Sequence, residues 1–133
     1  MTARASWLLP LLLMACTPDS SDTSTLAIDL RTDLVRFDEF NGIITRIGDG
    51  ELGSELSHTP VASENYLRGV RIAQDTVTHG ENVLTVSLIK DGEVVISRRV
   101  SVEVTPTPLQ TVTVVISRDC RGVMCPNDNP ALT

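Results

Sequence analysis

Cys16 is the residue of this 133-residue sequence whose type and position point most directly to a chemical role. It follows the small residue Ala15, and a cysteine thiolate is a strong nucleophile. Arg4 and the apolar residues 7–14 precede it, as in a secretory signal peptide. That apolar stretch is far shorter than the ~20 residues that a transmembrane helix needs. We therefore expect residues 1–15 to be a cleaved signal peptide. The alternative to a modified Cys16 is an ordinary signal peptide followed by a cysteine that has no chemical role.

Residues 13–16, Leu-Met-Ala-Cys, resemble the lipobox of bacterial lipoproteins. The resemblance implies that Cys16 receives a diacylglycerol, that cleavage occurs before it, and that the new amine is acylated. Several acyl chains hold a protein firmly, at ~0.8 kcal/mol per buried methylene. The expected partner is thus a membrane, reached through a lipid anchor. Thr17 stands where enteric lipoproteins of the inner membrane carry aspartate, which by analogy favours the outer membrane.

Cys120 and Cys125 remain as a pair once Cys16 is assigned to lipid. An exported chain meets an oxidising compartment, which favours a disulfide between them. Gly122 lies in the short loop that such a bond would close. A redox role is the alternative, although catalytic thiol pairs are usually separated by two residues rather than four.

Residues 48–65 form the longest stretch without a clear hydrophobic period. A loop of this length is often functional, so we take Asp49, Glu51, Glu55 and His58 as candidate binding-loop residues. The same stretch could instead hold a short edge strand and two turns around residues 59–63.

Nucleophile and metal motifs are weak elsewhere in the sequence. No Gly-x-Ser-x-Gly occurs, and His79 precedes Gly80 in an expected turn. The oxygen-bearing residues 49–51 and 127–129 do not follow the spacing of a calcium loop. We expect no catalytic residue, no metal site and no cofactor. A calcium-dependent adhesion-type module stays as an alternative.

Composition narrows the partners further. Lys and Arg total 11 against 17 Asp and Glu, a net charge of -6, and no basic run occurs, so nucleic acid is not an expected partner. Carbohydrate stacking needs exposed aromatic side chains, and Phe37, Phe40 and Tyr66 are expected in the core instead.

Alternating hydrophobicity predicts strands at residues 26–34, 37–47, 66–74, 82–90, 94–104 and 111–117. Asp91-Gly92 lies between two of them and is a preferred pair for a type I′ hairpin turn. Pro106 and Pro108 interrupt the ladder before the last strand. The residues expected to face inward in the last three elements are Val94, Ile96, Val100, Val102, Val104, Val112, Val114 and Ile116.

Six short strands rich in Val, Ile and Thr predict an all-β fold, an immunoglobulin-like or fibronectin-like sandwich of two sheets. The expected organisation is a signal peptide (1–15), a lipidated cysteine with a polar tether (16–25), a β-sandwich domain (26–119) and a disulfide-clipped tail (120–133).

Residues 30–34, 67–73 and 112–126 resemble secreted lipoproteins of myxobacteria and related predatory bacteria. The resemblance implies a single β-sandwich after the lipobox and a tail of the type Cys-x-Gly-Val-x-Cys-Pro. Longer members continue into a cysteine-rich segment, whereas this sequence ends eight residues after Cys125. The family carries no activity that transfers to this chain.

Together these features predict a membrane-anchored extracytoplasmic lipoprotein of the cell envelope that acts as a non-catalytic binding or structural module. Its expected partner is an envelope or surface protein. The alternatives are the calcium-dependent module, an envelope enzyme and a redox protein.

Overall fold

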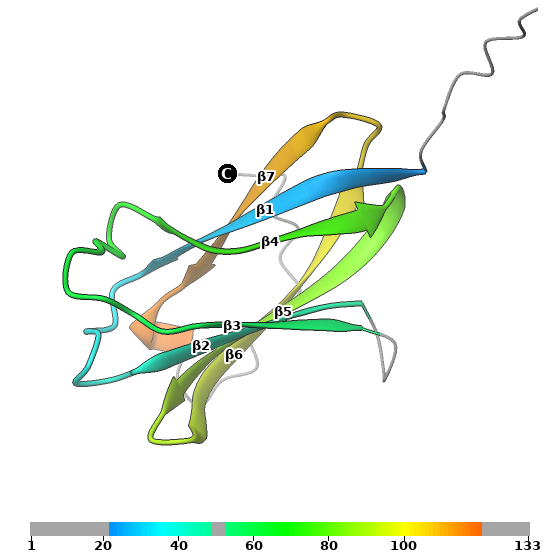
Figure 1. The fold of residues 1–133 in the computed structure, drawn as a ribbon. Helices are drawn as coiled ribbons and strands as arrows, with labels where there is room; N and C mark the ends of the chain where they lie inside the picture. The colour runs from blue at the N-terminus through cyan, green and yellow to red at the C-terminus, as the bar shows by residue number, and fades with distance from the viewer. Residues whose placement is uncertain (1–21, 49–52, 121–133) are drawn as a thin grey trace, which may run out of the picture.

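The computed structural model describes residues 22–48 and 53–120, which form two packed β-sheets. The strands are β1 (Thr23–Thr32), β2 (Gly42–Ile47), β3 (Ser54–His58), β4 (Val70–Thr78), β5 (Gly80–Lys90), β6 (Glu93–Val104) and β7 (Leu109–Ile116). A 3-10 turn, Arg118–Cys120, follows β7. The predicted two-sheet β-sandwich is confirmed (Figure 1).

One sheet has the order β4-β1-β7 and the other β3-β2-β5-β6. In immunoglobulin-type sandwiches strands B and E share one sheet, while C, F and G share the other. Strands β1 and β4 correspond to B and E, and β2, β5 and β6 to C, F and G. The edge beside β1 is occupied by β7, which runs parallel to it, with Thr25 opposite Leu109 and Thr32 opposite Ile116.

The core lies between the two sheets. Its fully buried side chains include Leu26, Ile28, Leu30, Phe40, Ile43, Leu84, Val86 and Leu88. Apart from Phe40, which precedes β2, they come from alternating positions of β1, β2 and β5, as expected where one face of each strand is buried. Phe40 meets Tyr66 edge to face, with ring centroids 5.3 Å apart and planes at 87°.

The hairpin of β5 and β6 has the predicted two-residue turn. Asp91 and Gly92 both have positive φ, 49° and 82°, as a type I′ turn requires. The Asn41 amide donates to Asp91 Oδ1 at 2.8 Å, and the Asp91 N–H donates to Asn41 Oδ1 at 3.0 Å. The turn is thereby fixed to the connection between β1 and β2.

Several predicted strand boundaries and the predicted inward orientation of Val94 were wrong. β1 begins at Thr23, inside the expected tether, and β2 begins only at Gly42. Val94 is 62% exposed although it was expected in the core. The pairing steps from Leu88↔Ile96 to Ile89↔Val94, so Val95 is an extra residue that reverses the alternation of β6.

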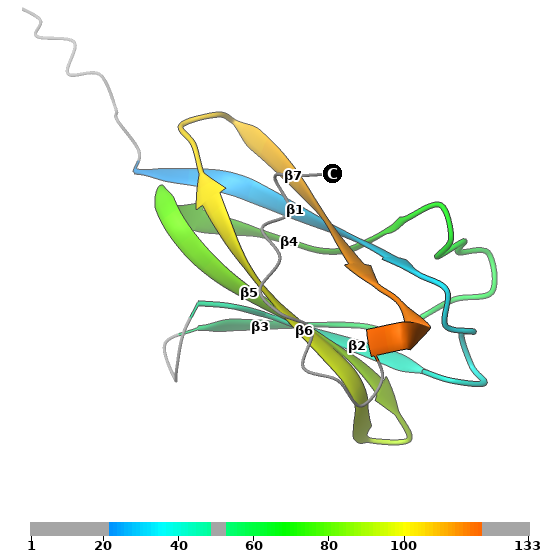
Figure 2. The same cartoon turned by 180° about the vertical axis from the view of Figure 1, so that it is seen from behind.

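The connections between strands lie in two groups, at opposite ends of the sandwich. β1, β5 and β7 run toward the end that carries residues 33–41, residues 59–69 and the turn at Asp91-Gly92. We call these three connections the loop end. The first described residues lie at the other end (Figures 1 and 2).

Candidate functional site

The loop end contains an open groove of about 710 Å³ between two connections. One wall comes from the end of β1 and the residues after it, and the other from the connection between β3 and β4. The lining residues are Thr32, Asp33, Leu34, Val35, Arg36, Phe37, Ala62, Ser63, Glu64, Asn65, Tyr66 and Leu67. Binding residues of sandwich domains are commonly carried on such loops, since a rigid scaffold positions them.

Glu64 is the hydrogen-bonding centre of this groove. Its Oε1 accepts from the Val61 N–H at 2.8 Å and from the Tyr66 hydroxyl at 3.1 Å. Its Oε2 lies 2.8 Å from His58 Nε2, which donates to the carboxylate. The Glu64 side chain is 16% exposed. Its largely buried carboxylate therefore holds these three donors in place in the groove wall.

The environment of Glu64 lowers its pKa below the ordinary value. Burial alone would raise that pKa, but the hydrogen bonds from Val61, His58 and Tyr66, together with the charge of His58, outweigh it. Glu64 is thus ionised at neutral pH. Burial and the charge of Glu64 raise the pKa of Tyr66, so its phenol stays protonated and acts as a donor.

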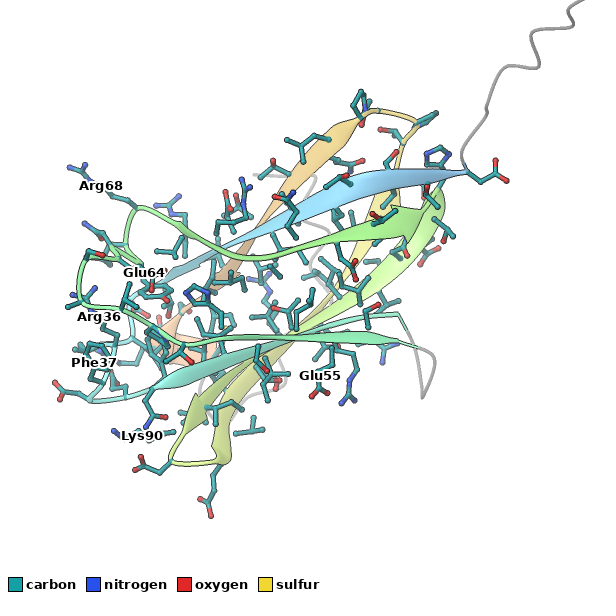
Figure 3. All side chains as sticks on the ribbon, viewed as in Figure 1. Arg36, Phe37, Glu55, Glu64, Arg68 and Lys90 are labelled. Carbon is teal, nitrogen blue, oxygen red and sulfur yellow. The ribbon has the colours of Figure 1, made fainter. Side chains whose placement is uncertain are left out.

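Arg36 joins the two walls. Its guanidinium donates to the backbone carbonyls of Glu64 and Ala62 across the groove. The Arg36 Cζ also lies 5.8 Å from the centroid of the Phe37 ring, within range of a cation–π contact. Arg36 therefore holds the connection after β1 against the connection after β3 (Figure 3).

Phe37 lies at the rim of the groove, not in the core where it was expected. Its ring is 47% exposed, and its φ of 69° lies in the left-handed region, which is unusual for an aromatic residue. The Phe37 N–H donates to Phe40 O at 2.6 Å, and Lys90 Nζ donates to Phe37 O. Because the chain turns tightly between Phe37 and the buried Phe40, the Phe37 ring lies on the surface.

A second protrusion of the rim is formed by Leu67 and Arg68. The side-chain oxygen of Asn65 accepts from the Leu67 N–H at 3.1 Å, and its carbonyl accepts from the N–H groups of Arg68 and Gly69, each at 3.2 Å. Gly69 has a φ of 115°, which L side chains rarely adopt. Arg31 Nε donates to Leu67 O at 3.3 Å. We call Leu67 and Arg68, held in this way, the knuckle.

The structure divides the predicted binding-loop residues. Asp49 and Glu51 lie outside the described residues. Glu55 and His58 lie on β3, so the edge-strand alternative holds for this part of the stretch. Glu55 forms an exposed ion pair with Arg46 at 2.6 Å and is not part of the groove wall. His58 supports the groove indirectly, through Glu64.

Sequence reasoning did not single out Glu64, Arg36 or the knuckle. The contact between Arg36 and Glu64 joins residues 28 positions apart in the chain, so no local spacing predicts it. The one available signal was Asn65 together with Gly69, a pair of turn-forming residues flanking the knuckle.

Of the three cysteines in the expected lipid anchor and tail, the structure describes only Cys120. Cys16 and Cys125 lie outside the described residues. Cys120 ends the 3-10 turn and packs against the core, with its Sγ 3.6 Å from Ser117 Oγ. Its pairing with Cys125 stays a prediction.

A serine–histidine pair lies at the opposite end of the sandwich. Ser24 Oγ is 2.8 Å from His79 Nε2 and donates to Thr105 O at 3.2 Å. The His79 N–H donates to Asp22 O at 2.9 Å. Ser24 is only 6% exposed, and its proton is directed to a carbonyl rather than to the imidazole. The arrangement joins the start of β1 to two connections.

Residues 22–48 and 53–120 offer neither a metal site nor a membrane-spanning helix. They contain no group of three or more His, Cys, Asp or Glu side chains arranged to hold a metal ion. They also include no helix with the length and apolar character to cross a bilayer.

Comparison with known proteins adds a likeness of fold. No protein-family model matches the chain, and no curated protein matches it. A leucine-rich repeat protein from Bacteroides thetaiotaomicron has a crystal structure that aligns with 74% of this chain and 12% of its own, with a TM-score of 0.52 and 12% identity. At that identity the likeness concerns the fold of one small part of the larger protein. The chain is similar to it as a β-sandwich.

Proposed function

We propose that this protein is a membrane-anchored extracytoplasmic lipoprotein, and that it acts as a non-catalytic binding module whose loop-end groove receives an envelope or surface protein. The observation that carries the proposal is the position of the groove, at the end of the sandwich opposite the start of β1 (Figure 1). An anchor at Cys16 would leave that end pointing away from the lipid.

The direction of β1 supports this geometry. Thr23 begins the strand and Thr32, at its far end, lines the groove. Ten residues at about 3.4 Å each span roughly 34 Å. A polar tether before Thr23 would add to that separation. The groove would therefore be accessible to a partner while the opposite end stays near the membrane.

The chemistry of the groove supports binding rather than catalysis. Both carboxylate oxygens of Glu64 are engaged by donors from the protein, and the Tyr66 phenol is directed at one of them. A general base needs a free acceptor within reach of a substrate proton. Here the polar groups are used to hold two connections in one shape, which lowers the cost of ordering them on binding.

The anchor is tested with the full chain and a Cys16→Ala variant, both expressed with the leader. Intact-mass spectrometry should find a chain that begins at an acylated Cys16, and the protein should partition into detergent. The variant should lack both properties. An unmodified chain with another first residue would overturn the lipid anchor.

The binding role is tested separately, by photo-crosslinking in cells. A photoreactive residue at Val61, an exposed position next to the groove-lining Ala62, should capture a distinct partner protein. The same residue placed at Thr76, an exposed position on β4, serves as the control. Equal capture at both positions, or capture at neither, would overturn the assignment of the groove as the binding surface.

A further inference from the structure

The strand β7 forms one edge of the first sheet, and the side of it that faces away from β1 has no partner strand (Figure 1). The Thr25 N–H donates to Pro108 O at 3.3 Å, and the parallel register then continues without a shift to the end of both strands. In such a ladder, alternate residues of β7 bond to β1. The N–H and C=O groups of Leu109, Thr111 and Thr113 therefore point away from β1, and within the described chain they have no hydrogen-bond partner.

One backbone group near the end of this edge is occupied. Arg98 of β6 donates from its guanidinium to Val115 O. That contact leaves residues 109–113 open. The side chains of Leu109, Thr111 and Thr113 are also exposed, on the face of the sheet that points away from the core. The open part of the edge is therefore accessible to another extended strand.

The other three edges of the sandwich carry features that oppose pairing with a further strand. The pairing of β4 with β1 shifts its register, and β4 carries the charged Arg71. The strand β3 is short and carries Glu55. The strand β6 is bulged at Val95 and carries Glu93 and Glu103. Short length, charges and bulges are the usual protections of an edge strand.

The strand β7 lacks these protections. Its sequence, Leu-Gln-Thr-Val-Thr-Val-Val-Ile, contains no ionisable side chain and no proline, and its pairing with β1 has no bulge. Valine and threonine also favour extended backbone. Because the whole chain has a net charge of -6, two copies repel each other on average. An uncharged edge is where they can approach without bringing like charges together.

We propose that two copies of this chain pair through β7, in an antiparallel arrangement with Thr111 of one copy opposite Thr111 of the other. A two-fold axis brings identical edges together, so that the free N–H and C=O groups of each Thr111 bond to those of the second copy. This register places Leu109 opposite Thr113 of the second copy and uses only the open residues 109–113. The two three-stranded sheets join into one continuous sheet.

The size and direction of this interface define how the pair behaves. A contact along one short strand lies well below the ~1,600 Å² of a standard interface, so the pairing is weak and depends on concentration. Since the strands are antiparallel, the two loop ends point in opposite directions and both grooves stay open. Anchored copies would meet this geometry from two facing membranes. The pairing goes beyond the proposed function and depends on neither the anchor nor the groove.

The Cys16→Ala chain tests the pairing without lipid. Sedimentation equilibrium should give the mass of one chain in dilute solution, rising toward that of two chains as the concentration is raised. Adding Thr111→Lys should keep the chain monomeric, because two lysines would lie directly opposite each other. Adding Thr76→Lys instead, at an exposed position on the opposite edge of the same sheet, should leave association unchanged. Circular dichroism should show that both variants fold, since both threonines are exposed.

A mixture of charge variants tests the register. Thr111→Glu should also be monomeric by itself, whereas an equimolar mixture of Thr111→Lys and Thr111→Glu should associate, because opposite charges then lie opposite each other. The mixture of Thr76→Lys and Thr76→Glu should associate no more strongly than the parent chain. Three results would overturn the inference: a parent chain that stays monomeric at every concentration, equal effects of lysine at the two positions, and a Thr111 mixture that stays monomeric.

Discussion

Glu64 shows how one carboxylate can fix a loop. It accepts hydrogen bonds from the backbone of Val61, from His58 on β3 and from Tyr66 beside the core. Glu64→Gln removes the charge that strengthens these bonds and forces an N–H group among donors. We expect a loss of about 1–3 kcal/mol in the free energy of unfolding, measured in urea at neutral pH.

Glu55→Gln is the matched control for that variant. Glu55 also pairs with a basic side chain, but its side chain is 49% exposed. An exposed pair contributes at most about 1 kcal/mol. Equal losses for the two variants would mean that Glu64 is no more than another surface acid.

The lowered pKa of Glu64 predicts a pH dependence with a definite sign. Because the pKa is lower in the folded chain than in the unfolded one, ionised Glu64 stabilises the fold above the ordinary value of 4.5. That stabilisation is lost as the pH falls through the folded pKa. In thermal melts, the stability difference between the wild type and Glu64→Gln should shrink below about pH 4.5. A difference that stays constant to acid pH would contradict this account.

At the scale of the strand, β6 offers a direct test of the bulge at Val95. Val102 is 5% exposed and Val94 is 62% exposed, although both lie at even positions of one strand. Val102→Asp should abolish folding, since it buries an unpaired carboxylate. Val94→Asp should change stability by no more than about 0.5 kcal/mol. Circular dichroism during urea titration distinguishes the two, and equal damage would contradict the reversed alternation.

Alternation was enough to predict most of the strands, because one face of each is buried. It also gave the correct inward set over Leu26, Ile28 and Leu30 of β1. It failed at Val95, where an extra residue reverses the alternation of β6. Bulges depend on the partner strand, so the period of one strand does not contain them.

The groove was less predictable than the sheets. The stretch of residues 48–65 was expected to hold either an edge strand or a functional loop. The structure shows an edge strand at Ser54–His58 and places residues 62–65 in one groove wall, and their binding role stays a prediction. The exposure of Phe37 depends on a left-handed turn, and the role of Arg36 depends on carbonyls far along the chain. Neither has a signature in local spacing.

At the scale of the whole molecule, β7 is essential to the first sheet. Its Val114 and Ile116 are 2% and 1% exposed, and it pairs with the full middle and end of β1. A chain ending after Pro108 should lack cooperative unfolding. A synthetic peptide of residues 109–117 should restore it, monitored by circular dichroism.

The same peptide with Val114→Asp should fail to restore the transition, because the carboxylate would enter the core. Cooperative unfolding of the shortened chain alone would show that β7 is dispensable.

The parallel pairing of β1 with β7 also bears on when the chain can fold during synthesis. The pairing of β1 with β7 can form only after all the intervening strands have been synthesised, since Thr25 is opposite Leu109. A nascent chain therefore keeps one edge of β1 open until the ribosome has released residues beyond Ile116. Pairings this distant in sequence also form slowly. Under the proposed export, late closure of this sheet would delay folding until translocation is well advanced.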